Sequence, residues 1–312
     1  MPRFRDRAMT FADADERSHA RGTASWWWES WHLDVASADG VGLAVRLALV
    51  PALGVAWWWT HLFLPGLEGA VVVRDHDVGL PRQGLEIRAD GLWAELTCES
   101  PFEHWTYGLE AFGVRLDDPA DSLHGEIGER MPVGLDVEWE VDADFGTPLE
   151  SRAGERDGYE QFGRVHGEVL LERSRFELDA VGLRSHTWGA ARFDRASSAA
   201  WLRGPDLALS FLSEGDSCVG YVVRGGEAEP VSSVRPETHR RVDGLPVAAR
   251  YVVDDRFEID ADVLGLAVIP LAGPTGAAST LTRGLCRFEV AEGAERAMSE
   301  PSIGWSSWLD PV

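Results

Sequence analysis

Arg184, His186 and Trp188 stand at alternate positions of residues 182–189, whose sequence is Gly-Leu-Arg-Ser-His-Thr-Trp-Gly. Alternate residues of a β-strand lie on one face of the sheet, so these three side chains share a face if the segment is a strand. An arginine can orient or polarise an oxygen of a ligand, and a histidine can act as a general acid or base near neutral pH. A tryptophan beside them can pack against an apolar ligand.

The residues before this segment predict which face of the strand is buried. From 175 to 180 the even positions are apolar and the odd positions are charged. An unbroken strand therefore points Arg184, His186 and Trp188 inward, although Gly182 could host a bulge that reverses the parity. Buried ionisable groups are costly unless they are paired, so an inward Arg–His pair is a candidate catalytic site. The alternative is a satisfied polar network that ties two β domains together.

A second group of candidate residues lies between 99 and 110, where three carboxylates, a histidine and two aromatic rings suit a ligand wall that carries an acid. Glu110 is the candidate proton donor or acceptor of this group. If the segment is a strand, only one of two sets of side chains can face inward: Trp105, Tyr107 and Leu109, or His104, Thr106 and Glu110. The alternative is a solvated loop and strand with no ligand.

A tryptophan-rich run gives three further candidate ligand-binding residues, namely Trp57, Trp59 and His61. The alternative for His61 is a histidine of the core. Residues 75–77, Asp-His-Asp, could hold a metal, but consecutive strand residues diverge and no second ligand pair follows. We therefore predict no metal site, and no motif indicates a cofactor.

The elements that must position these residues are short strands. Apolar residues alternate with polar ones in many segments, as at residues 133–141, 207–211 and 247–253, with turn signals about every 8–12 residues. Long stretches with helical periodicity are absent. This pattern predicts an all-β protein of antiparallel sandwiches or barrels.

The length of 312 residues predicts about two domains. Residues 28–34 and 188–194 share Trp, a large apolar residue and Asp at one offset, which favours a duplication. We therefore expect a polar N-terminal segment at 1–24, a first β domain at 25–187 and a second at 188–312.

The charge and composition exclude several function classes. The net charge of −23 argues against a nucleic-acid or anionic-membrane partner. All 29 basic residues are arginine, so lysine Schiff-base chemistry and the lysine-containing phosphate loop are impossible. Three distant cysteines without a CxxC pair favour buried thiols in a reducing compartment, and hence a cytoplasmic location.

Residues 41–73 are the most hydrophobic part of the chain. Charged residues, prolines and glycines divide them into pieces shorter than the roughly 20 residues of a membrane-spanning helix. We predict buried strands here and no membrane span, and residues 1–24 lack the apolar core of a secretory signal.

Three short sequence motifs together resemble those of the carotenoid hydratase (hydroxyneurosporene synthase)-like superfamily. They are the central segment 182–189, the preceding residues 163–168 (Gly-Arg-Val-His-Gly-Glu) and the upstream residues 104–119 with His104-Trp105, Glu110-Ala-Phe-Gly and Asp117-Asp-Pro. The chain looks most similar to an uncharacterised actinobacterial branch. The resemblance spans most of residues 25–310 and is specific in these motifs alone; the tryptophan-rich N-terminal third matches no motif.

This resemblance implies two consecutive lipocalin-like β-barrels and relatives that are hydratases or pericyclic cyclases of apolar polyenes. Arg184, His186 and Trp188 correspond to positions of the motif in that superfamily. We expect a large apolar ligand of terpenoid, steroid or polyene-like type and cofactor-free acid–base hydration, isomerisation or cyclisation at an alkene. His186 or Glu110 would move the proton and Arg184 would steady the developing charge. The alternative is a carrier without chemistry; the oligomeric state is left open.

Overall fold

The computed structural model describes residues 11–125, 128–147, 149–150, 156–190, 193–273, 278–293 and 301–311. Two short 3-10 helices, η2 (Asp13–Glu16) and η3 (Pro119–His124), accompany twenty strands in this part of the chain. The strands of the first sheet are β1 (Trp27–Ala36), β2 (Gly42–Val50), β3 (Val55–Phe63), β4 (Ala70–Gly79), β5 (Leu85–Ala89), β6 (Leu92–Ser100), β7 (His104–Leu116), β8 (Glu129–Val141), β9 (Leu149–Glu150), β10 (Arg156–Leu171) and β11 (Ser174–Ala190). Those of the second are β12 (Ser197–Arg203), β13 (Ala208–Glu214), β14 (Ser217–Arg224), β15 (Glu227–Pro230), β16 (Val234–Arg240), β17 (Pro246–Val253), β18 (Phe257–Ala272), β19 (Ala278–Glu292) and β20 (Ser302–Pro311).

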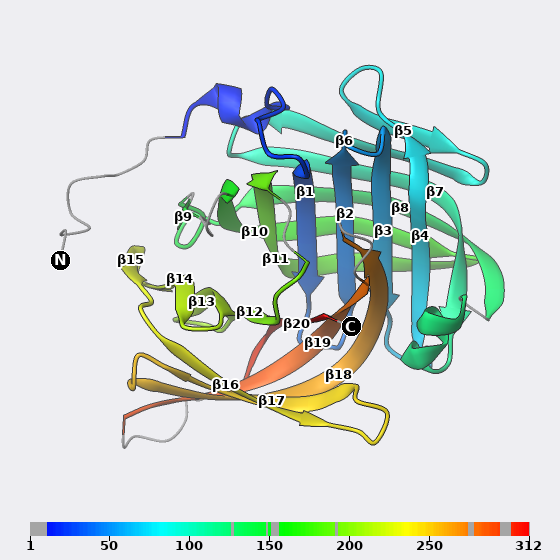
Figure 1. The fold of residues 1–312 in the computed structure, drawn as a ribbon. Coiled ribbons are helices and arrows are strands. Elements are labelled where there is room, and N and C mark those ends of the chain that lie inside the picture. Colours follow the sequence, from blue (N-terminus) through cyan, green and yellow to red (C-terminus); the bar gives the residue numbers. More distant parts are fainter. Residues whose placement is uncertain are drawn as a thin grey trace.

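The first sheet closes on itself. Its strands follow the order β4-β3-β2-β1-β11-β10-β8-β7-β6-β5, and β4 also pairs with β7. This extra pairing joins the two sides of the sheet into a barrel, from which β6 and β5 extend (Figure 1). A closed barrel leaves few free strand edges and encloses one core.

The second sheet has nine strands in the order β15-β14-β13-β12-β20-β19-β18-β17-β16. It curves beneath the first barrel in Figure 1, and its neighbouring strands pair antiparallel in the part of the chain that the structure describes. The prediction of an all-β protein with two consecutive antiparallel barrel or sandwich units is confirmed. The position after residue 187, where we expected the domains to divide, lies within β11 of the first sheet.

The two tryptophan-containing segments that favour a duplication do not begin equivalent strands of the two sheets. Trp28 and Gly189 face each other in the pairing of β1 with β11, so both segments begin on adjacent strands of the first barrel. The duplication stays a prediction.

Several strands are buried on both faces because the two sheets pack against each other. All ten residues of β1 are buried, as are most residues of β2 and β3. One side of these strands fills the first barrel and the other meets the second sheet, where Phe63 lies against Trp305. This two-sided burial explains the hydrophobic run at 41–73, whose prediction as buried strands is confirmed.

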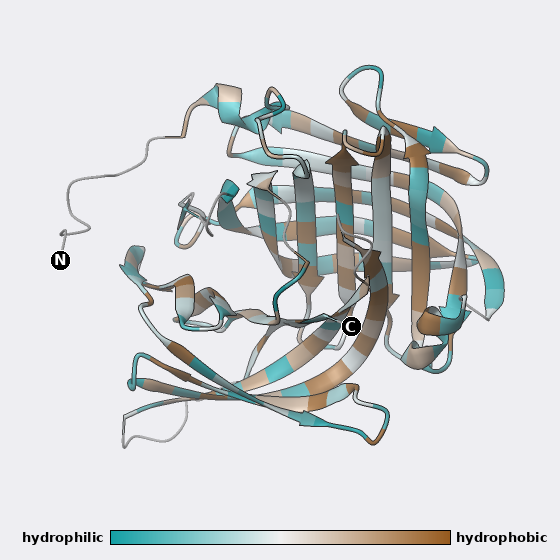
Figure 2. Cartoon of the chain, viewed as in Figure 1, coloured by the Kyte–Doolittle hydropathy of each residue, from teal (hydrophilic) through white to brown (hydrophobic). Residues whose placement is uncertain are grey.

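β18 shows the same effect within one strand. Its first half alternates apolar and acidic residues and its second half is continuously apolar (Figure 2). Val268 belongs to the core of the second sheet, whereas Ile269 and Leu271 belong to a cluster with Trp28 and Trp57 of the first barrel. The change of pattern marks where β18 begins to pack between the two cores.

Candidate functional site

Strands β1 and β11 pair over their whole common length and present two different polar faces. Leu178 and Ala180 belong to the core of the first barrel, and Arg184 and His186 follow with the same parity. The predicted inward orientation is confirmed, since Arg184 is 2% and His186 0% exposed. The opposite face, with Ser185 and Thr187, turns toward the second sheet.

Arg184 forms a buried ion pair with Glu16 of helix η2. Its Nη1 donates to Glu16 Oε2 at 3.0 Å and its Nη2 to Glu16 Oε1 at 2.5 Å. Nη2 also donates to Gln161 Oε1 of β10. The guanidinium lies 4.7 Å from the ring centroid of Trp139, with three more aromatic rings within 6 Å. Burial opposes the charge, but the tyrosines and Glu16 around the group leave the pKa of Arg184 raised.

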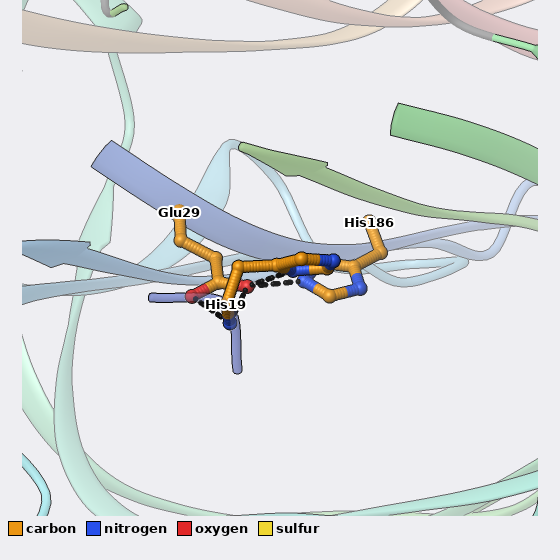
Figure 3. Close-up of side chains that lie close together, drawn as sticks. All are labelled: His19, Glu29 and His186. Atoms are coloured by element: carbon orange, nitrogen blue, oxygen red, sulfur yellow. Dashed lines mark hydrogen bonds and ion pairs between the residues drawn. The ribbon is translucent and has the colours of Figure 1, made fainter. Parts of the chain in front are cut away.

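His186 lies beside Glu29 of β1 and His19 of the N-terminal segment (Figure 3). Its Nε2 is 2.9 Å from Glu29 Oε1, and its Nδ1 is 2.8 Å from the carbonyl oxygen of Asp15. His19 reaches the same carboxylate through its Nδ1 at 2.8 Å and stacks on Trp188 with ring centroids 3.7 Å apart. Burial lowers the pKa of His186, although Glu29 acts in the opposite direction.

These contacts show what the predicted motif is attached to. Arg184, His186 and Trp188 hold residues 15–19, which cross the end of the first barrel. The alternative reading of the motif, a network that ties the two domains together, is therefore corrected. Among the described residues, the hydrogen-bonding and stacking partners of these three side chains belong to the N-terminal segment and the first barrel, because the side chains point away from the second sheet.

The parity of β7 is now resolved. Trp105, Tyr107 and Leu109 are buried inside the first barrel, near Arg184. Glu110 is exposed on the outer face, so the structure does not bring it to His186. His104, also on the outer face, lies 3.1 Å from Glu138.

The tryptophan-rich strand β3 places its candidates toward the second sheet. Trp57 and Trp59 pack in a cluster with Trp28, Phe193 and residues of β18. His61 is fully buried, and neither ring nitrogen has a hydrogen-bonding partner among the described residues. The guanidinium of Arg46 lies over the ring of Trp59, 5.3 Å from the ring centroid.

A cavity of about 200 Å³ lies between the two barrels. One part of its wall is apolar and includes Trp28, Leu183, Phe193, Trp201, Phe211, Leu271, Leu281 and Trp305. Another part is charged or polar and includes His32, Asp34, Arg46, Arg156, Glu160, Ser210, Glu214 and Arg283. Apolar walls with a few converging polar groups are typical of a small-molecule site.

The charged wall centres on Asp34 of β1. Arg283 of β19 donates to its Oδ2 at 2.5 Å and Trp201 of β12 donates to the same oxygen at 3.0 Å, so both bonds join the second sheet to the first. His32 Nε2 lies 2.8 Å from Oδ1. Burial would raise the pKa of Asp34, but Arg283 and His32 hold it well below its usual range. The group is a permanent carboxylate.

His32 is the neutral member of this group. Arg46 Nη2 lies 3.0 Å from His32 Nδ1, and since arginine only donates, that nitrogen accepts. Burial, together with the positive charges of Arg46 and Arg283, lowers the pKa of His32 to about 3. The ring is therefore uncharged at neutral pH.

Glu160 of β10 is a second carboxylate on the cavity wall. Its Oε2 accepts hydrogen bonds from the hydroxyls of Ser210 at 2.7 Å and Tyr221 at 3.0 Å, both from the second sheet. Burial and the neighbouring Glu160 raise the pKa of Tyr221 well above its ordinary value, so this phenol keeps its proton. Glu160 is thus an acceptor held in position by two donors from the second sheet.

Most residues of this cavity were not predicted. His32 and Asp34 lie within residues 28–34, whose sequence favours a duplication and indicates no site, and Glu160, Ser210 and Arg283 belong to no recognisable motif. The sequence held one usable signal. His32 and Asp34 alternate with Leu33 and Val35, so β1 has a charged face opposite an apolar face. A strand with charge on one face and hydrophobic neighbours on both sides indicates a second packed layer.

The two-barrel architecture with a cavity between the barrels defines a class of proteins of lipocalin-like fold. Solved structures with this fold include a protein provisionally designated AttH from Nitrosomonas europaea (12% identity, 100% of both chains, TM-score 0.64). Others are CghA with Sch210972 (10% identity, 92% of this chain and 88% of that chain, TM-score 0.57) and kievitone hydratase from Nectria haematococca (11% identity, 91% and 88%, TM-score 0.55).

A family model described as a domain of unknown function (DUF7064) matches residues 12–312, and the chain belongs to this family. No protein in the search of curated proteins matches it. Within the described residues, no helix has the length and apolar character needed to cross a membrane.

Proposed function

We propose that the protein binds an apolar small molecule of terpenoid, steroid or polyene-like type between its barrels and catalyses cofactor-free acid–base chemistry at an alkene. The observation that carries this proposal is the division of the cavity wall into an aromatic side and a charged side. A cavity of about 200 Å³ is smaller than the roughly 300–1,000 Å³ of drug-sized sites, so it suits a compact part of a larger ligand.

The charges favour a reaction in which an oxygen becomes negative. Arg46 and Arg283 line the cavity and are held by groups that do not move with the ligand, which is the arrangement that stabilises a developing oxyanion. An alkene conjugated to a carbonyl meets this requirement. When water adds to its β-carbon, the π electrons move to the carbonyl oxygen and form an enolate.

Glu160 would move the proton in this addition. It takes a proton from water as the new C–O bond forms, and then returns the proton to the α-carbon as the enolate collapses. The hydroxyls of Ser210 and Tyr221 hold its carboxylate in place. Isomerisation or cyclisation could use the same acid and oxyanion groups.

Two further observations support this proposal. One protein of similar fold is named a hydratase. The sequence motifs resemble those of the hydroxyneurosporene synthase-like superfamily, and most closely those of an actinobacterial branch of it. We also propose a cytoplasmic location, on the ground that the three cysteines are free thiols.

The test uses β-ionone, a terpenoid enone, as the probe with the full-length protein. Binding is followed by quenching of tryptophan fluorescence, since Trp28, Trp201 and Trp305 line the cavity. Turnover is followed as incorporation of labelled water by mass spectrometry. Glu160→Gln is expected to lower turnover by roughly 10²–10⁴-fold with binding retained. Glu214→Gln, on the same cavity wall, is the matched control and should retain turnover.

The outcomes separate an enzyme from a carrier. Binding without turnover in the wild-type protein would favour a non-catalytic carrier of apolar ligands. Equal turnover in the wild-type and Glu160→Gln proteins would remove Glu160 from the chemistry. Neither binding nor turnover, with this probe and a polyene such as β-carotene, would overturn the assignment of the cavity as a ligand site.

A further inference from the structure

His19, Glu29 and His186 form a compact group outside the cavity between the barrels (Figure 3). Each residue offers one ligand atom, and the three atoms lie within 4.8 Å of one another. Glu29 and His186 have almost fully buried side chains, whereas His19 is 21% exposed and opens the group to solvent. The residues come from the N-terminal segment, β1 and β11.

The contact between His186 and Glu29 is not an ordinary hydrogen bond if the histidine ring is neutral. His186 Nδ1 lies 2.8 Å from the carbonyl oxygen of Asp15, which only accepts, so this nitrogen carries the proton of the neutral ring. The other nitrogen, Nε2, then has a lone pair and faces Glu29 Oε1 at 2.9 Å. Two acceptors at this distance repel each other unless a cation lies between them or the buried ring takes a second proton.

His19 adds a second imidazole to the same oxygen. Its Nδ1 lies 2.8 Å from Glu29 Oε1, and its backbone N–H donates to that oxygen at 2.9 Å. Two imidazole nitrogens thus approach the same carboxylate oxygen. This is a donor set that zinc prefers, with three protein ligands and a fourth position left for water.

The surroundings have the features that orient metal ligands. The Nδ1–H of His186 donates to a backbone carbonyl, which selects the tautomer whose Nε2 can bind a metal. The ring also stacks on Trp31 with centroids 4.4 Å apart, while His19 stacks on Trp188. Both imidazole planes are therefore held in place.

We propose that His19, Glu29 and His186 bind a divalent zinc ion that fastens the N-terminal segment across the end of the first barrel. Tetrahedral zinc with bonds of about 2.0–2.1 Å places its ligand atoms about 3.3 Å apart, so each imidazole nitrogen must move about 0.5 Å from the Glu29 oxygen. His19 can supply its own part of this movement because it lies outside the strands. The ion would occupy a position distinct from the cavity between the barrels.

The second group with metal-binding residue types provides an internal control. His104, Glu138 and Glu140 lie on the outer face of the first barrel and are half-buried or exposed. Among the residues that the structure describes, none gives His104 a backbone carbonyl contact or a stacked ring like those of His186. Zinc held at this surface would depend on His104 and not on His19.

The experiment treats the full-length protein with a chelator, removes the chelator and titrates zinc chloride by calorimetry. Wild type and His104→Ala are expected to bind one tight zinc ion per chain, and X-ray absorption should show imidazole and oxygen ligands at about 2.0–2.1 Å. His19→Ala should lose this binding. Glu29→Gln, which keeps the size of the side chain, is a second variant in case the first does not fold.

A second readout follows the segment itself. Arg17 and Arg21 are exposed and flank His19, so trypsin can report how firmly the segment is held. Zinc should slow cleavage at these sites in the wild type and leave cleavage of His19→Ala unchanged. Zinc binding that survives in both His19→Ala and Glu29→Gln, or that disappears in His104→Ala, would overturn the proposal. So would the absence of tight binding in the wild type, which would leave a protonated His186 paired with Glu29.

Discussion

Arg184 illustrates how one buried cation is accommodated without a ligand. Its charge is met by both oxygens of Glu16 and by Gln161, and aromatic rings surround the rest of the guanidinium. Glu16 in turn accepts the backbone N–H of Phe102 at 2.7 Å. A side chain from the N-terminal segment therefore completes the interior of the first barrel.

The buried pair should be much more sensitive to loss of one partner than a surface pair. Glu16→Gln removes the negative charge and leaves Arg184 buried beside a neutral amide. The free energy of unfolding should fall by about 3 kcal/mol or more, measured by urea denaturation. Glu258→Gln breaks the exposed pair with Arg250 and should cost less than about 1 kcal/mol. Similar losses in the two variants would show that the Glu16 contact does not stabilise the barrel.

At the scale of elements, glycines allow β8, β10 and β11 to pack around large rings. Gly163 of β10 lies between Gly182 of β11 and Val141 of β8 in the sheet. A Cβ on Gly163 would lie 2.3 Å from two atoms of the Trp139 ring and 2.4 Å from the carbonyl oxygen of Glu140. Close packing thus explains Gly163, the first residue of the motif at 163–168.

Gly163→Ala should destabilise the first barrel. The indole of Trp139 is fully buried in the core of the first barrel, so overpacking should cost about 1–3 kcal/mol. Gly79→Ala in β4 is the control, because no atom lies within 4 Å of the added Cβ. This control should be neutral or slightly stabilising, by about 0.5–1 kcal/mol. Thermal unfolding of both variants tests the difference, and an unaffected Gly163→Ala would contradict the packing argument.

The strands were predictable from local pattern, and their assembly was not. Alternation predicted β8, and the parity of residues 175–180 predicted the inward direction of Arg184 and His186. The partners of these residues, Glu16, Glu29 and His19, lie more than 150 positions away along the chain. No local pattern encodes such contacts, so the N-terminal segment was interpreted only as polar.

At the scale of the whole molecule, the packing of the two barrels creates the candidate site. Asp34 is joined to Arg283 and Trp201, and Trp305 donates to the carbonyl oxygen of Val35 at 2.9 Å. The charged wall is therefore completed only when both barrels are in contact. The sequence predicted an aromatic pocket with few polar groups, but two of the aromatic residues proposed for its wall, Trp105 and Tyr107, belong to the filled core of the first barrel.

The same packing buries histidines in the neutral state, which makes the stability of the molecule depend on pH. Burial, with the positive charges of Arg283 and Arg74, lowers the pKa of His61 to about 3. The unfolded chain has a histidine pKa of about 6.5. Below that pH the unfolded state binds a proton that the folded state does not, so stability falls as the pH falls from about 6.5 toward 3. His32 and His76, with pKa values of about 3 and about 4, act in the same direction.

His61→Leu should therefore reduce the acid sensitivity of the protein. Each neutral buried histidine contributes a slope of about 1.4 kcal/mol per pH unit once the unfolded state is protonated, and this variant removes one such contribution. Urea denaturation of wild type and variant between pH 7 and pH 4 measures the two slopes. Thr60→Val, at the neighbouring buried position of β3, alters packing without a titrating group and should keep the wild-type slope. If His61→Leu keeps that slope as well, His61 is protonated in the folded state, and the space between the barrels stabilises a cation that its neighbouring arginines should repel.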